Sequence, residues 1–200
     1  MDTLLDGYRR FRSRHWSAHE ALYRSLDYGQ RPPVCVISCC DSRVDPVTIF
    51  DAEPGHLFVI RNVANLVPPF RAGDGLQGTS TAIEFAVRQL KVRQMIVLGH
   101  ARCGGVAAAL DGRLARDGTF LGNWVSLLDA AKARAGAAAD VHAAVEYASV
   151  RVSLERLTTF PFVADAVAAG TLELTGALFS IFDGRLEILD RDSGEFRAVD

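Results

Sequence analysis

Three short apolar segments, separated by stretches with helical periodicity, constrain the fold of this chain more than any other feature. The segments are Val34–Ser38, His56–Ile60 and Met95–Leu98, and Val, Ile and Leu are frequent in them. Such runs are typical of strands that are buried on both faces of a sheet. Because helical segments alternate with them, we predict an α/β fold built on a mainly parallel central sheet.

The rest of the chain predicts helices that flank this sheet and one antiparallel strand at its edge. Thr81 and Glu84 have the spacing of a capping box at the start of a helix. Asp183-Gly184 stands between two apolar runs and predicts a tight hairpin turn. Further helices are predicted over residues 1–30, from Pro46, and over Leu121–Ala139, Val141–Thr159 and Pro161–Gly170, with hairpin strands within Leu172–Phe182 and Leu186–Leu189.

Length predicts a single domain. The chain has 200 residues, which is enough for one sizeable core, and it contains no repeat, low-complexity stretch or linker. We divide the expected domain, residues 1–200, into an N-terminal helical arm (1–30), a core with the polar clusters described below (31–105), and a helical region with the terminal hairpin (106–200).

Charge and composition exclude some classes of partner. The formal net charge of −2 does not indicate the basic surface that nucleic-acid-binding proteins usually have. No apolar run approaches the roughly 20 residues of a membrane span, and the N-terminus lacks the pattern of a signal peptide. Cys35, Cys39 and Cys40 crowd into one segment, away from Cys103, which is a poor layout for disulfides. We therefore expect reduced thiols and a cytoplasmic protein.

Two polar clusters follow the first and third predicted strands. Cys39-x-Asp41-x-Arg43 comes after one, and His100-x-x-Cys103 comes after the other. Ligands bind at the carboxyl ends of parallel strands, so the two clusters can converge on one site. Two thiolates and an imidazole suit zinc, and three protein ligands leave the fourth position open, as in catalytic zinc sites. The sequence therefore predicts a catalytic zinc held by Cys39, His100 and Cys103.

Asp41 and Arg43 suggest how the fourth position is controlled. Asp41 could reach the metal or turn away to Arg43, which competes well because an arginine–carboxylate pair can be bidentate. Each part has a plainer interpretation: Asp41–Arg43 alone is more often a structural ion pair, and His-x-x-Cys alone is weak. Cys40 could replace Cys39 as ligand, whereas Cys35, inside a strand, fits a buried core residue.

These motifs resemble those of the β-class carbonic anhydrases. The resemblance is specific from Gln30 to Gly105 and looser through Arg151–Phe162 and the terminal hairpin. It is carried by Cys39-x-Asp41-Ser42-Arg43-Val44, by Pro54-Gly55-x-Leu57-Phe58-Val59-x-Arg61-Asn62-Val63-Ala64-Asn65, by Gly78–Leu90 and by Gly99-His100-x-x-Cys103-Gly104-Gly105.

The resemblance implies reversible hydration of carbon dioxide to bicarbonate and a proton by zinc-bound hydroxide, with one zinc per chain. Asp41 would be a fourth ligand in a closed site or a hydrogen-bond acceptor in an open one, with Arg43 holding it open. The family forms dimers and often tetramers, in which the N-terminal helices lie on a partner subunit. By position, the substrate pocket would comprise Gln30, Phe58, Val63, Phe85 and the backbone N–H of Gly104, some of its apolar wall being lent by the neighbouring subunit.

The sequence departs from the family at one regulatory feature. Some members have an inhibitory bicarbonate site built from Trp, Arg and Tyr, and the corresponding positions here are Val36, Arg61 and Phe85. We therefore expect an open zinc site that bicarbonate does not inhibit in this way. No proton shuttle can be assigned, because surface exposure is the default for the candidate histidines, which are His15, His19, His56 and His142.

Three other functions are compatible with the same residues. The zinc core could act on carbonyl sulfide or carbon disulfide, since pocket shape rather than ligands separates those enzymes. An inactive zinc-binding regulator is a second alternative, against which the presence of Asp41, Arg43 and Gln30 argues. A redox sensor using the four cysteines is the third.

Overall fold

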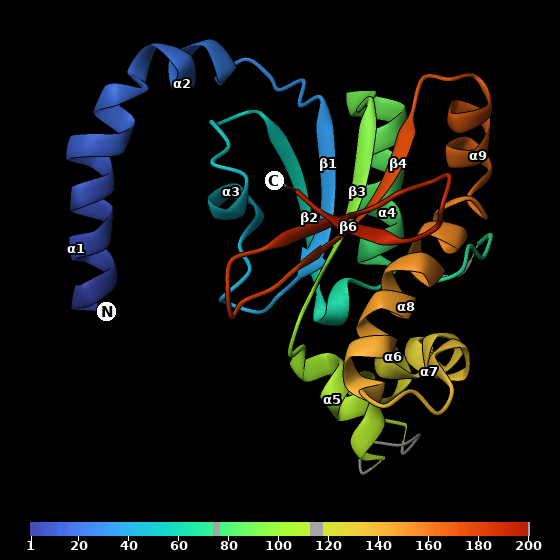
Figure 1. The fold of residues 1–200 in the computed structure, drawn as a ribbon. Coiled ribbons are helices and arrows are strands. Elements are labelled where there is room, and N and C mark those ends of the chain that lie inside the picture. The colour runs from blue at the N-terminus through green and yellow to red at the C-terminus, as the bar shows by residue number, and fades with distance from the viewer. Residues whose placement is uncertain (74–76, 113–117, 200) are drawn as a thin grey trace.

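The computed structural model describes residues 1–73, 77–112 and 118–199, and it is built on one six-stranded sheet (Figure 1). The strand order is β2-β1-β3-β4-β5-β6. Pairing is parallel among the first four strands and antiparallel for β5 and β6. The strands are β1 Val34–Cys39, β2 Leu57–Asn62, β3 Gln94–His100, β4 Glu173–Phe179, β5 Leu186–Leu189 and β6 Phe196–Ala198.

This architecture confirms the predicted α/β class and the mainly parallel sheet, with one correction. Two antiparallel strands lie at the edge, where we predicted one. After β5 the chain turns at 190–195, where Oδ1 of Asp190 accepts the backbone N–H of Ser193 at 2.7 Å and Gly194 has φ 69°. The returning strand β6 has only three residues and no apolar run, so periodicity could not reveal it.

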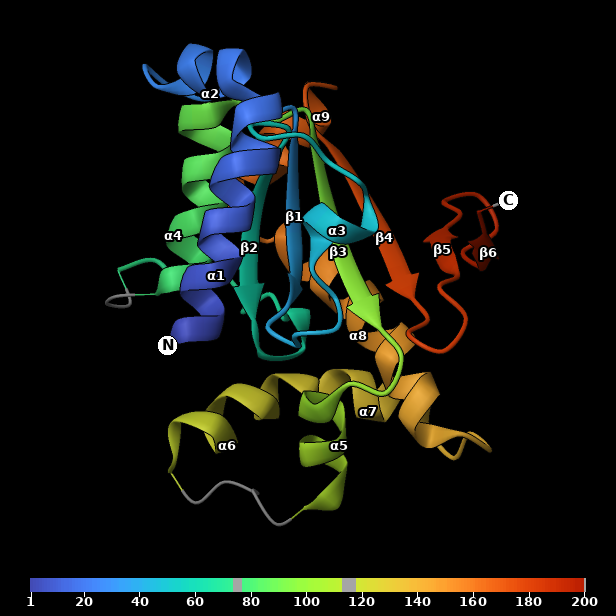
Figure 2. The same ribbon diagram turned by 90° about the vertical axis from the view of Figure 1, so that its left-hand side faces the viewer.

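Helices surround the sheet unevenly. The helical elements are α1 Asp2–Arg10, η1 Phe11–Trp16, α2 Glu20–Leu26, α3 Pro46–Ile49, η2 Val63–Asn65, α4 Gly78–Glu84, η3 Phe85–Leu90, α5 Gly104–Asp111, α6 Phe120–Val125, η4 Ser126–Leu128, α7 Asp129–Ala135, α8 Val141–Leu157 and α9 Pro161–Ala168. Figure 2 shows α5, α6 and α7 grouped at the carboxyl ends of the parallel strands. This group closes the end of the sheet at which the polar clusters were predicted.

Side chains of β1 alternate between two cores, as expected for a strand with period two. Cys35 and Ile37 pack in the cluster that includes Ile83 of α4 and Leu157 of α8. Val36 packs on the opposite face with Leu98 and with residues of α3 and β5. Both faces of β1 are buried, which confirms the interpretation of its continuous apolar run.

Two predicted helix boundaries are wrong. The capping box is not at the start of α4, because this helix begins at Gly78; inside it, Thr81 Oγ1 donates to the carbonyl of Gln77, and Glu84 pairs with Arg88. The helix expected over 121–139 is three pieces, α6, η4 and α7, and it ends at Ala135 because Gly136 adopts φ 57°.

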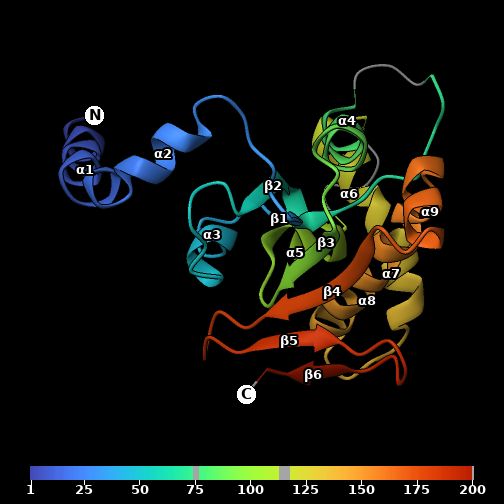
Figure 3. The same ribbon diagram turned by 90° about the horizontal axis from the view of Figure 1, so that it is seen from above.

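The N-terminal helices form an arm that extends away from the sheet (Figures 1 and 3). Its apolar side chains face solvent in the single chain: Leu4 is 75% exposed and Tyr8 60%. An isolated helix gains little stability without tertiary packing, so this arm needs a surface to cover. Within residues 1–73, 77–112 and 118–199, each helix is too short or too polar to cross a bilayer.

Candidate metal centre

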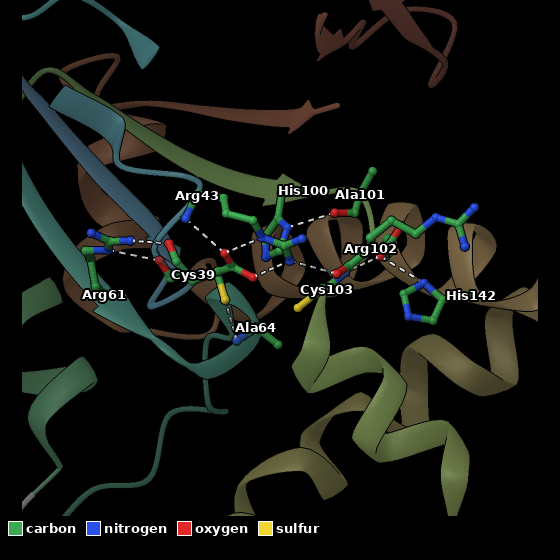
Figure 4. Close-up of polar contacts among 11 residues, drawn as sticks. Cys39, Arg43, Arg61, Ala64, His100, Ala101, Arg102, Cys103 and His142 are labelled. Carbon is green, nitrogen blue, oxygen red and sulfur yellow. Dashed lines mark hydrogen bonds and ion pairs between the residues drawn. The ribbon is translucent and has the colours of Figure 1, made fainter. Parts of the chain in front are cut away.

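Three ligand side chains converge at the carboxyl ends of two adjacent strands. Cys39 ends β1, His100 ends β3, and Cys103 precedes α5 as its N-cap. Because β1 and β3 pair in parallel, with Ser38 opposite Leu98, both strand ends reach the same edge. Their ligand atoms all lie within 4.8 Å of one another, and the three residues are buried (Figure 4). The convergence predicted from the sequence is confirmed.

The orientation of His100 fits a metal ligand. Its Nδ1 lies 2.9 Å from the carbonyl oxygen of Ala101, and because a carbonyl only accepts, Nδ1 carries the proton. Nε2 therefore holds a lone pair. Nε2 is buried and has no hydrogen-bond partner among the described residues. Since buried polar atoms are nearly always satisfied, this orphaned nitrogen indicates a partner such as a metal ion.

The two thiols behave as a coupled pair. Contact with the Cys103 thiol lowers the pKa of Cys39 to about 4, and the same contact raises the pKa of Cys103. The Cys39 sulfur also accepts the backbone N–H of Ala64 at 3.3 Å. A bound zinc ion would displace any proton on these thiols, because thiolate is the form that ligates metal.

The neighbouring cysteines lie outside this cluster. Cys40 is exposed, and the cluster of possible metal ligands among the described residues contains Cys39 instead. Cys35 is buried in the core, where burial raises its pKa to about 12. The structure therefore favours Cys39 over Cys40, as we inferred from spacing.

Asp41 forms a bidentate ion pair with Arg43. Arg43 Nε donates to Asp41 Oδ1 at 2.9 Å, Nη2 donates to Oδ2 at 2.7 Å, and the Arg43 backbone N–H adds a bond to Oδ1 at 3.0 Å. These bonds hold the pKa of the Asp41 carboxyl well below its usual range. The carboxylate is ionised at neutral pH and is turned toward Arg43, which is one of the two positions that the spacing left open for it.

Arg61 holds the loop that carries Asp41, a role that the sequence did not reveal. From β2, its Nε donates to the carbonyl of Cys39 at 2.9 Å, and its Nη2 donates to the carbonyl of Asp41 at 2.7 Å. Its Nη1 pairs with Asp45 Oδ2 at 3.0 Å. These three bonds connect β2 to the loop between Cys39 and Asp45.

Glu146 is also near the centre and was missed by the sequence analysis, and His142, for which surface exposure was expected, is half-buried beside it. Glu146 of α8 is buried and accepts the backbone N–H of Cys103 at 2.8 Å. His142, one turn earlier, lies with Nδ1 2.9 Å from the same carboxylate oxygen. A usable signal existed: Glu146 stands in the apolar stripe of α8 with a histidine four residues before it.

Of the five predicted substrate residues, two lie beside the cluster. Val63 packs in the same buried group as Cys39, and its carbonyl accepts Trp124 Nε1 at 2.8 Å. Gly104 directly follows Cys103. Val63 and Trp124 also line a cleft of about 890 Å³ that reaches Cys40.

The other three predicted substrate residues are not brought to the cluster within one chain. Phe58 is paired with Cys35 near the amino end of β1, and its ring lies 5.9 Å from that of Phe85. Phe85 is 44% exposed. Gln30 precedes β1, whereas Cys39 ends it, and the strand itself spans about 17 Å from Val34 to Cys39 at 3.3 Å per residue.

Comparison with known proteins identifies the family. The profile described as carbonic anhydrase matches residues 34–186. The chain belongs to the carbonic anhydrase family. A carbonic anhydrase of Synechococcus elongatus is 32% identical over 207 aligned positions, covering 100% of this chain and 75% of the relative. The chloroplastic β carbonic anhydrase 5 of Arabidopsis thaliana is 38% identical and covers 82% of this chain, which spans only 56% of that relative.

Solved structures place the chain in the β class of carbonic anhydrases. The β-carbonic anhydrase CcaA superposes with a TM-score of 0.92 at 31% identity, covering 100% of this chain and 92% of that one. A β-carbonic anhydrase of Sordaria macrospora, described as tetrameric, gives 0.80 at 30% identity, with coverages of 94% and 95%. The resemblance that the sequence motifs carried is confirmed, and zinc is the metal that the family uses.

Proposed function

We propose that this chain catalyses the reversible hydration of carbon dioxide to bicarbonate and a proton, with one zinc ion held by Cys39, His100 and Cys103. The observation that carries the proposal is the buried Cys–His–Cys cluster with its unpartnered His100 nitrogen, in a carbonic anhydrase fold. When bound, zinc supplies Lewis acidity, which acidifies a water molecule and provides a nucleophile near neutral pH.

In this proposal Asp41 orients the nucleophile. A carboxylate offers about four acceptor positions, and Arg43 occupies two on Oδ1 and one on Oδ2. Oδ2 therefore keeps a free acceptor position for the attacking water. Because Arg43 holds the carboxylate ionised, Asp41 accepts a hydrogen bond and directs the oxygen lone pair toward carbon dioxide. Arg43 acts through Asp41.

The substrate pocket would be completed by a second copy of the chain. Val63 and the Gly104 N–H lie beside the cluster, and the cleft there is lined partly by apolar groups that suit carbon dioxide. Gln30, Phe58 and Phe85 lie too far along the sheet to serve the same chain's zinc. We propose that they serve the partner's site, and that the exposed arm covers the partner in a homodimer or homotetramer.

We also propose the open, non-allosteric type of site. Val36 is fully buried between strands, Phe85 lacks a hydroxyl, and Arg61 is engaged by Cys39, Asp41 and Asp45. These positions offer no ready anion site. The free cysteines fit a reducing compartment, and we place the protein in the cytoplasm on that ground.

The deciding experiment is stopped-flow hydration of carbon dioxide by the wild type and by Asp41→Asn, with zinc measured in both. We expect about one zinc per chain in each protein and a loss of about 100-fold or more in kcat/KM for the variant. Asp165→Asn, at an exposed position of α9, is the matched control. A wild type that holds full zinc but does not hydrate carbon dioxide would contradict the proposal.

Two rivals are tested by the same preparations. Release of hydrogen sulfide from carbonyl sulfide or carbon disulfide, faster than carbon dioxide hydration, would assign the site to those substrates. Full zinc with neither activity would indicate a regulatory protein, in which the bidentate Asp41–Arg43 pair would have no evident purpose.

A further inference from the structure

A buried carboxylate lies directly behind one of the proposed zinc ligands. Glu146 is 4% exposed, and one of its oxygens accepts two bonds, from the Cys103 backbone N–H at 2.8 Å and from His142 Nδ1 at 2.9 Å. The hydration mechanism above assigns it no task. Burial raises the pKa of Glu146, so placing an acid here costs stability unless its partners offset the cost.

The turn that carries Cys103 needs such support. Arg102 adopts φ 58°, a left-handed conformation that non-glycine residues rarely take. Cys103 follows as the N-cap of α5, so its own N–H has no acceptor within that helix. Glu146 supplies the acceptor from α8, which contacts both β3 and α5. The hydrogen bond between Glu146 and the Cys103 N–H thus lies where β3, α5 and α8 come together.

We propose that Glu146 is a positioning residue that fixes the backbone of Cys103, and thereby its thiolate, for zinc, with His142 holding the carboxylate in place. This inference rests on the zinc site of the proposed function. Outer partners of metal ligands determine ligand orientation, and their loss typically costs 10- to 100-fold in metal affinity or activity. His142 is half-buried, so it can hold the outer side of the carboxylate (Figure 4).

The test is the rate of zinc loss from the loaded protein to a chromogenic chelator. We expect Glu146→Ala to release zinc about 10- to 100-fold faster than the wild type. Glu146→Gln keeps an acceptor oxygen at the same reach, and we expect its rate to stay within about threefold of the wild type. Glu155→Gln is the matched control, because this exposed glutamate of α8 pairs with Arg134 far from the cluster.

A second readout separates positioning from general stability. In the cobalt-substituted protein, displacement of Cys103 should shift the thiolate-to-metal absorption band in Glu146→Ala but not in Glu155→Gln. If Glu146→Ala does not fold, Glu146→Asp serves instead, since it keeps the charge but is one methylene too short to reach the Cys103 N–H. It too should release zinc faster.

A folded Glu146→Ala or Glu146→Asp that releases zinc at the wild-type rate, with an unshifted cobalt band, overturns the inference. This outcome leaves the proposed function intact. By contrast, a wild type that binds no zinc refutes the proposed function, so failures of the two are distinguishable.

Discussion

Two adjacent cysteines have opposite environments, and this contrast decides their chemistry. Cys39 is buried among the proposed zinc ligands, and Cys40 is exposed and lines the cleft beside Val63 and Trp124. Consecutive residues of an extended segment point to opposite sides, so only one of the pair can face the cluster. A single position therefore separates a metal ligand from a solvent-accessible thiol.

This contrast predicts how many thiols react quickly with and without zinc. With zinc bound, one thiol per chain, Cys40, should react quickly with an aromatic disulfide reagent at pH 8. A strong chelator should free Cys39, whose pKa is lowered to about 4, and raise the fast count to two, whereas the raised pKa of the buried Cys103 keeps that thiol slow. Cys35 should stay slow, because burial raises its pKa to about 12, and at pH 8, far below that value, it remains protonated and covered.

Cys40→Ser is the control, since it should abolish the fast reaction of the zinc-loaded protein without changing its zinc content. Three fast thiols in the loaded wild type would contradict the assignment of ligands and would favour the redox-sensor alternative.

At the scale of elements, the start of α5 packs closely on the turn after β2. A Cβ on Gly105 would lie 2.8 Å from Val63 Cγ1 and 2.9 Å from Ala64 Cβ. Ala64 donates its N–H to the Cys39 sulfur, and α5 begins directly after Cys103. The close approach of the Gly105 backbone to the Val63 and Ala64 side chains thus sets the spacing of the two thiols.

Gly105→Ala should therefore force α5 and the 63–65 turn apart. We expect a loss of about 1–3 kcal/mol in the free energy of unfolding, the typical cost of overpacking. Denaturant unfolding of the zinc-loaded and zinc-free proteins measures it, and the loss should be larger with zinc because the thiols separate. Gly104→Ala is the matched control, since its added Cβ would meet nothing within 4 Å. Equal stability of the two variants would contradict this prediction.

What the sequence could predict at this scale follows from the range of the interactions. The strand ends and the Cys39, His100 and Cys103 cluster depend on local apolar runs and on parallel pairing, so pattern alone located the cluster, and it located the strand ends to within two residues. Glu146 and Arg61 act across 43 and 22 residues of sequence, so a local pattern can mark Glu146 as unusual within its helix but cannot show what either residue contacts. The start of α4 was misplaced because capping-box spacing also occurs inside helices.

At the scale of the whole molecule, the proposed zinc ligands and three of the residues proposed for the substrate pocket lie toward opposite ends of the sheet. The zinc cluster lies at the carboxyl ends of β1 and β3, and Gln30 with the Phe58–Phe85 pair lies toward the amino end of β1. The arm before Gln30 is exposed along its apolar side chains. A two-fold dimer would cover that arm and would bring each half to the complementary half of the partner.

This arrangement predicts complementation between two inactive variants. Cys39→Ser should lose zinc, and Gln30→Ala should lose a substrate contact. In a mixed dimer, the chain with Gln30→Ala keeps Cys39 and so binds zinc, and its partner with Cys39→Ser still supplies Gln30 to that site. The second site carries both defects, so we expect about half of the wild-type activity per dimer. Co-expression with two different affinity tags isolates the mixed species for the carbon dioxide hydration assay.

If Gln30 served its own chain, the mixed dimer should show no complementation. Each site of the mixed dimer would then carry one defect, and activity would not exceed the mean of the two parents. Mixed-tag dimers in which both chains carry Cys39→Ser control for carry-over of wild-type enzyme and should be inactive. Because β1 places about 17 Å between Val34 and Cys39, we expect Gln30 to reach a zinc-bound substrate in the partner subunit and not in its own chain.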